Sequence, residues 1–200
     1  MTVEQRSDLD PIFKAVLFAA VKHDGQIRKD AQGSPYITHP IQVAQALVEI
    51  GHVTETSTLV AAILHDTLED TKTTRDEIRD TFGEEILQIV LEVTDNKSLE
   101  KMERKRQQVI HAPHISDQAK NIKLGDKLIN CRDILNSPPK NWTLERRREY
   151  IQWAADVVEN LRNTNAALEF AFDQMLLEAE ERLAFLIEPY DNINQRPWAP

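Results

Sequence analysis

The chain has 200 residues, 41% of them hydrophobic, and its apolar runs stay well short of the roughly 18 residues that a membrane-spanning helix needs. Its net charge of −9 argues against general binding to nucleic acid or to an anionic membrane. The single cysteine, Cys131, excludes an internal disulfide and a cysteine-rich zinc site, and with no visible signal peptide it favours the cytoplasm.

Apolar residues recur at helical spacing through most of the chain, and no segment shows the alternation of a strand. The first predicted helix begins at Asp10 and Pro11, where an N-cap side chain precedes a proline, and ends at Gly25. A second helix follows over residues 40–50, with His39 at its N-terminal end. The predicted fold class is therefore all-α.

The loop between these two helices, residues 25–39, is too polar and too rich in glycine and proline to be a core element. Loops on a rigid scaffold often carry binding groups. Three side chains of this loop are therefore candidate binding residues: Arg28, Lys29 and Tyr36.

A buried apolar run over residues 59–64 leads directly into the sequence HDTLED at residues 65–70. Four side chains there can hold a metal or a proton: His65, Asp66, Glu69 and Asp70. If the helix continues, these four fall within roughly 140° of arc and face one cavity. Three carboxylates beside apolar sequence need a compensating positive charge, and a divalent cation is the simplest one.

Cap signals locate the remaining helices. Thr74 opens a capping box and predicts a short helix that ends near residue 83, followed by a helix over about residues 84–95. Ser116 and Thr143 are the expected caps of two longer helices.

These signals predict one bundle of about eight to ten helices. The last two helices either close the same core or form a surface for a homodimer. The expected organisation is a single domain over residues 1–188, with a metal-site core at about residues 10–135, closing helices at about 143–187, and a loose tail at 189–200.

Two clusters of basic residues stand out in this acidic chain. The first contains Lys97, Lys101 and residues 104–106, and the second is residues 146–148. Such clusters either gather phosphate groups or form solvated helix faces paired with nearby glutamates. The sequence alone leaves both interpretations open.

One hypothesis joins the separate candidates. Asp126 lies in a largely apolar predicted helix, and Asn130, four residues on, shares its face. With His39, His65 and Asp66 it would give two imidazoles and two carboxylates, a set that suits manganese, iron or magnesium. Such a cation would polarise a phosphoryl oxygen and activate a water, which the two carboxylates one turn beyond Asp66 could position. The predicted reaction is hydrolysis of a phosphate ester.

Four segments resemble the HD-domain metal-dependent phosphohydrolases, specifically the hydrolase domain of the RelA/SpoT homologues. They are residues 25–29 (GQIRK), 35–40 (PYITHP), 65–70 (HDTLED) and 123–132 (KLGDKLINCR). The resemblance is strongest to the small single-domain alarmone hydrolases typified by the metazoan SpoT homologue. It extends from about Phe18 to Phe172, which is most of the chain.

The resemblance implies a manganese-dependent enzyme that removes the 3′-pyrophosphate of guanosine tetra- and pentaphosphate, leaving GDP or GTP. It implies that the metal is held by His39, His65, Asp66 and Asp126. It assigns the attacking water to Glu69 and Asp70. It implies substrate contacts for Arg28, Lys29, Tyr36, Lys97, Lys101, Asn130 and Arg146. Metazoan relatives also remove the 2′-phosphate of NADPH, so a phosphatase acting on another nucleotide such as NADPH is the alternative.

Two positions depart from the family pattern. Gly125 stands where the family more often has alanine, which could shift the helix that carries Asp126. Asp133 follows Arg132 where long bifunctional members tend to have a hydroxyl residue. Neither departure removes a predicted ligand, whereas a catalytically silent nucleotide-binding module would be expected to lack one.

Overall fold

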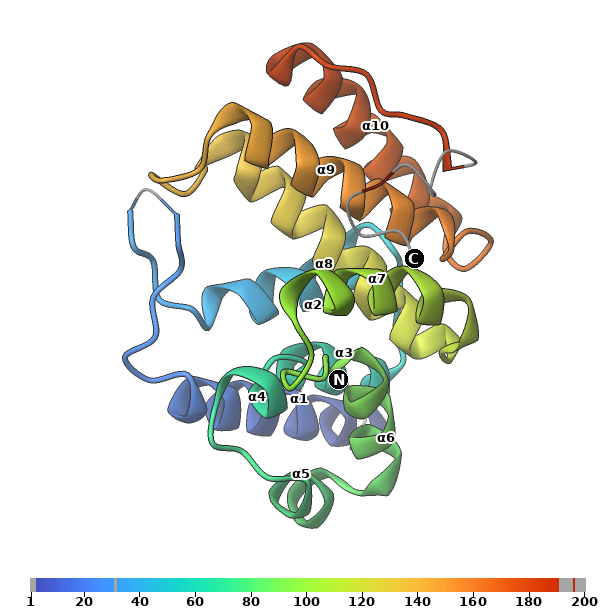
Figure 1. Cartoon of the computed structure of the whole chain (residues 1–200). Helices are drawn as coiled ribbons and strands as arrows, with labels where there is room; N and C mark the ends of the chain where they lie inside the picture. The colour runs from blue at the N-terminus through green and yellow to red at the C-terminus, as the bar shows by residue number, and fades with distance from the viewer. Residues whose placement is uncertain (1–2, 31, 191–195, 197–200) are drawn as a thin grey trace.

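The computed structural model describes residues 3–30, 32–190 and 196, and within them the chain forms ten α-helices, one 3₁₀-helix and no sheet (Figure 1). The predicted all-α class is confirmed. No helix among these residues is long and apolar enough to cross a membrane. The elements are α1 (Val3–Lys22), α2 (Thr38–Glu49), α3 (Thr56–Leu64), α4 (Thr67–Asp70), α5 (Arg75–Phe82), α6 (Glu84–Val93), α7 (Lys101–His111), η1 (Ala112–His114), α8 (Asp117–Asn136), α9 (Leu144–Glu159) and α10 (Ala166–Leu183).

Helix α3 lies at the centre of the bundle, and all its residues from Thr58 to Leu64 are buried. Helix α1 packs against it, as do α2 and α6. The second central helix is α8, which contacts α2, α6, α9 and α10. In Figure 1, α1 and α5 form the lower edge of the molecule and α9 and α10 the upper part. Because α2, α3 and α8 all contact one another, residues at their ends can meet at one point.

Gly125 allows α8 to approach α2 closely. A Cβ atom at this position would lie 3.1 Å from Leu47 Cδ2 and 3.4 Å from Val43 Cγ1, both on α2. The absence of a side chain at Gly125 therefore permits close packing of the two helices. The crossing also sets the separation of His39, on α2, from Asp126, on α8.

Three predicted helix caps are confirmed, because the side chain accepts a hydrogen bond from the backbone N–H three residues later: Thr74 for α5, Ser116 for α8 and Thr143 for α9. The predicted start of α1 at Asp10 is wrong, since the helix begins at Val3 and continues through Pro11. Proline removes one N–H donor, but its fixed φ is helical and the rest of the helix proceeds.

The continuous helix predicted through residues 65–70 is also wrong. Helix α3 ends at Leu64, and His65 and Asp66 form a turn before the short α4. The hydroxyl of Thr67 donates to the carbonyl of Leu64 at 2.6 Å. In an uninterrupted helix that carbonyl accepts from the N–H four residues on, so the side chain competes with the helical bond.

The C-terminal segment is held at Arg196. Its Nε donates to Asp156 Oδ2 on α9 at 3.0 Å, and both side chains are buried. A loose tail therefore does not describe this residue. Residues 191–195 and 197–200 of the predicted tail lie outside the described residues.

Candidate active site

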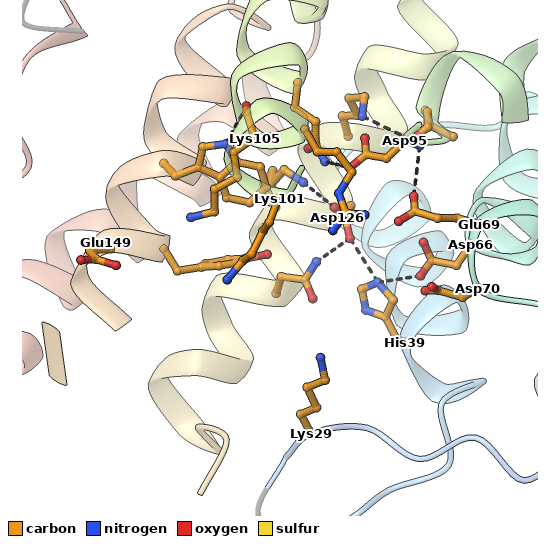
Figure 2. A pocket seen from close by; sticks show the side chains of 18 of the residues that line it. Lys29, His39, Asp66, Glu69, Asp70, Asp95, Lys101, Lys105, Asp126 and Glu149 are labelled. Atoms are coloured by element: carbon orange, nitrogen blue, oxygen red, sulfur yellow. Dashed lines mark hydrogen bonds and ion pairs between the residues drawn. The ribbon is translucent and has the colours of Figure 1, made fainter. Parts of the chain in front are cut away.

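Three elements bring the four predicted metal ligands to one point. His39 Nε2 lies 3.1 Å from Asp126 Oδ1 and 3.8 Å from Asp66 Oδ2. His65 Nε2 lies 3.1 Å from Asp66 Oδ2 and 3.9 Å from Asp126 Oδ1. One donor atom from each of His39, His65 and Asp126 lies within 4.8 Å of the other two. Figure 2 shows His39, Asp66 and Asp126 turned toward one another from different elements.

The donor chemistry of this cluster fits a divalent cation. His65 Nδ1 donates to the Ala62 carbonyl at 2.8 Å, which directs Nε2 toward the carboxylates. Although Asp66 Oδ2 is 3.1 Å away, this buried Nε2 meets no described group in hydrogen-bonding geometry. Burial acts to lower the pKa of His65, but the charges of Asp66 and Asp126 raise it to about 9. The cluster therefore favours a positive charge at Nε2, and a cation held by two imidazoles and two carboxylates supplies it.

The two carboxylates of the cluster stay ionised. Burial acts to raise the pKa of both Asp66 and Asp126. It is outweighed by positive charge, chiefly His65 for Asp66 and Lys127 for Asp126, so each pKa lies below its ordinary value.

Three neutral or cationic donors orient these carboxylates. The Tyr36 hydroxyl donates to Asp66 Oδ2 at 2.5 Å. Asn130 Nδ2 donates to Asp126 Oδ1 at 2.6 Å, and Lys127 Nζ donates to Asp126 Oδ2 at 2.8 Å. Groups that hold metal ligands in this way preserve the geometry of a site.

Glu69 and Asp70 follow the cluster and have different surroundings. Glu69 Oε2 accepts a hydrogen bond from the backbone N–H of Asp95 at 3.1 Å. Burial, together with the charge of Asp95, raises the pKa of Glu69 to about 7. Asp70 forms an ion pair with Lys97 and lies 3.3 Å from the Tyr36 hydroxyl. Glu69 therefore has the pKa of a group that can take up a proton near neutral pH.

The cluster opens into a cavity of about 850 Å³. Glu69, Asp66 and Asp70 lie on one side of it in Figure 2, and Lys101 and Lys105 face them from the other. The basic residues that line this cavity, which we call the basic wall, are Lys29, Lys101, Arg104, Lys105, Lys123, Lys127 and Arg146. Such a cavity can hold a ligand with negative charge at two separate places.

A family model described as an HD domain matches residues 15–157. The chain belongs to the HD-domain family. Guanosine-3′,5′-bis(diphosphate) 3′-pyrophosphohydrolase MESH1 of Xenopus tropicalis is 51% identical over 172 residues, which cover 86% of this chain and 96% of that protein. The Homo sapiens protein of the same name is 48% identical, with coverage of 84% and 94%. The resemblance to these hydrolases that the motifs indicated is confirmed.

A solved structure agrees with this assignment. It is a metazoan orthologue of SpoT, described as hydrolysing ppGpp, and it matches with a TM-score of 0.82 at 45% sequence identity over 84% of this chain and 94% of its own. A second solved structure, lmo0812 of Listeria monocytogenes, matches with a TM-score of 0.61 at 29% identity over 76% of this chain and 98% of its own.

Five of the seven residues predicted to contact substrate in this HD-domain chain line the large cavity: Lys29, Tyr36, Lys101, Asn130 and Arg146. Arg28 lines an adjoining cavity of about 580 Å³, and its guanidinium is bonded to Asp133 and to Gln42. Asp133, one of the two departures from the family pattern, thus positions Arg28. Lys97 is not among the described residues that line either cavity, although it pairs with Asp70, which lines both.

Sequence reasoning missed two residues that link the cavity lysines to the His/Asp cluster, Trp153 and Lys127. The ammonium groups of Lys105 and Lys127 lie 4.9 and 4.6 Å from the centre of the Trp153 ring. Burial and the charge of Lys101 lower the pKa of Lys105 to about 8. A signal for Lys127 existed, because it and Lys123 are four residues apart inside an apolar segment of α8.

Proposed function

We propose that this HD-domain protein hydrolyses guanosine 3′,5′-bis(diphosphate), and the corresponding pentaphosphate, to GDP or GTP and pyrophosphate. The observation that carries the proposal is that a His/Asp cluster and a basic wall share one cavity. This nucleotide has one diphosphate on the 3′-oxygen and one on the 5′-oxygen of its ribose. One of them can meet a cation in the His/Asp cluster while the other meets the basic wall. The relatives that carry this activity in their names match over nearly their whole length.

We propose manganese as the cation, held by His39, His65, Asp66 and Asp126. Bound there, it polarises a phosphoryl oxygen and lowers the pKa of a water. Asn130 and Lys127 hold the two oxygens of Asp126 so that Oδ1 faces His39. These contacts support a single orientation of the ligand set.

Glu69 is proposed to take the proton from the attacking water. Its carboxylate is held by the Asp95 N–H, and a pKa of about 7 lets it alternate between the ionised and protonated forms. Water then adds to phosphorus as the bond to the 3′-oxygen breaks. That oxygen leaves with the electron pair and takes up a proton from solvent to become the 3′-hydroxyl, and Glu69 returns its own proton to solvent. Asp70 is proposed to assist by holding Lys97 beside the same carboxylates.

The proposal also assigns the substrate contacts. Arg28 would lie against the base, since a planar guanidinium suits that surface. Lys29, Lys101 and Arg146 would contact phosphates, and Tyr36 and Asn130 would contact the ribose side. The positions of five of these residues on the walls of the large cavity support this assignment. Lys97 would contact a phosphate with the N–H donors of its ammonium that its pair with Asp70 leaves available.

The proposed base predicts a pH dependence. Because Glu69 must be ionised to accept a proton, turnover should fall as the pH falls through its pKa of about 7, and a bound cation moves this limit downward. Asp95→Asn removes a neighbouring negative charge but keeps the N–H that donates to Glu69. We expect the acid limb of kcat/KM to move to lower pH by roughly half to one unit. The measurement is the pH profile of kcat/KM for the natural sequence and for Asp95→Asn. If the acid limb lies at the same pH in both, Glu69 does not determine it.

The direct test is product analysis. Manganese-loaded protein is incubated separately with guanosine tetraphosphate, guanosine pentaphosphate and NADPH, and the products are separated by anion exchange. We expect pyrophosphate with GDP or GTP from the first two. Orthophosphate from NADPH, with no product from either guanosine substrate, would overturn the proposed substrate and favour the 2′-phosphatase instead.

A further inference from the structure

Helix α1 is apolar on two faces. One face packs against α3 and buries Ala15 and Ala19 completely. The other exposes four apolar side chains at intervals of four residues: Leu9 (38% exposed), Phe13 (62%), Leu17 (69%) and Val21 (73%). Since residues four apart are neighbours on a helix, these four form one continuous row, which we call the α1 row.

The two lysines of α1, Lys14 and Lys22, leave this row uncovered. Lys14 Nζ donates to the Thr81 carbonyl at 2.7 Å and lies over the Phe82 ring, while Lys22 pairs with Glu77 at 2.6 Å. Their aliphatic stems are therefore drawn toward α5, although lysine stems often shield apolar surface. The row exposes on the order of 450 Å² of apolar area, a size at which patches on a protein surface usually have a function.

We propose that the α1 row is the interface of a homodimer. The row is symmetric about the midpoint between Phe13 and Leu17. A two-fold axis through that midpoint places Phe13 against Leu17 of the second copy and Leu9 against its Val21. Each contact then occurs twice, as a closed two-fold interface requires.

The apolar area of the α1 row is large enough for a homodimer interface. Two copies of the α1 row bury about 900 Å² of apolar surface, and because the apolar share of homodimer interfaces is about 65%, the total is roughly 1,400 Å². That value lies within the range of about 1,200–2,000 Å² that stable interfaces bury. The described residues that line the two cavities include no member of the row, so the dimer leaves both active sites open.

The test is the mass of the full chain in solution. Sedimentation velocity across two orders of magnitude in concentration should show a dimer for the natural sequence. Leu17→Glu should halve the mass, because each copy would then bury an unpaired carboxylate against Phe13 of the other. Leu177→Glu is the matched control, since Leu177 on α10 is 59% exposed and should leave the dimer intact. Circular dichroism and pyrophosphate release should be unchanged in both variants, which separates this proposal from the proposed function.

Cross-linking tests the position of the axis. Cys131 is fully buried, so a cysteine introduced on α1 is the reactive one. A mixture of Phe13→Cys and Leu17→Cys chains should form mixed disulfide dimers on oxidation. Their yield should be at least twofold higher than the yield of disulfide dimers from either variant oxidised alone. A monomer at every concentration, a dimer that survives Leu17→Glu, or a dimer lost only in Leu177→Glu would each overturn the proposal. The last result would place the interface on α10.

Discussion

Asp66→Asn is expected to remove the bound divalent cation and to lower kcat/KM by well over the roughly 100-fold that follows loss of a group outside a ligand set. The change keeps the size of the side chain and an oxygen that can accept from the Tyr36 hydroxyl. It removes the negative charge that lies 3.1 Å from His65 Nε2 and 3.8 Å from His39 Nε2. A divalent cation held mainly by neutral imidazoles binds more weakly than one that also has two carboxylates.

The measurement is the metal content of the protein after dialysis against manganese, together with turnover of guanosine tetraphosphate. Asp76→Asn is the control, because Asp76 lies on α5, is exposed and pairs with Arg79, three residues on. If Asp66→Asn kept both its cation and its turnover, the ligand set would be wrong. Loss of turnover with a full complement of manganese would mean that Asp66 acts on the reaction in another way.

The helices were predictable where local chemistry decides them. Thr74, Ser116 and Thr143 satisfy backbone N–H groups only three residues away, so a short stretch of sequence contains both partners. The break after Leu64 was not predictable in the same way. It depends on a competition between the Thr67 hydroxyl and a helical N–H for one carbonyl, which spacing alone does not decide.

The proposed ligands could be found from the sequence because the motif residues are chemically distinctive and match a known family. Their supporting contacts could not, because they join distant parts of the chain. Trp153 meets Lys105 and Lys127 only when α7, α8 and α9 have packed. Arg28 meets Asp133 across 105 residues of sequence. Contacts of this kind are set by tertiary packing. The periodicity of apolar residues within one helix does not predict them.

The basic clusters show the same limit. The sequence left open whether Lys97 and Lys101 gather phosphate or pair with acidic neighbours. The structure separates the two residues, since Lys101 lines the cavity and Lys97 pairs with Asp70. Lys97 and Lys101 are close in sequence, but their surroundings differ because Asp70 lies beside Lys97 in the folded chain.

Glu69→Gln is expected to lower kcat by about 10²–10⁴-fold, the usual contribution of a general base, while the manganese content stays unchanged. Glutamine has the size of glutamate, and its Oε1 can still accept from the Asp95 N–H, so the surrounding backbone should keep its position. It cannot accept a proton from water near neutral pH. The proton acceptor is therefore lost, whereas the proposed ligands His39, His65, Asp66 and Asp126 are all present.

The two variants together separate binding of the cation from proton transfer. Asp66→Asn should lose metal and turnover, and Glu69→Gln should lose turnover alone, measured on the same preparations with Glu85→Gln on the exposed face of α6 as control. A Glu69→Gln protein with full turnover would assign the proton to another group, with Asp70 next to be tested. Loss of metal in Glu69→Gln would instead make Glu69 part of the ligand set, and its pKa of about 7 would then reflect burial and the charge of Asp95 rather than a role as base.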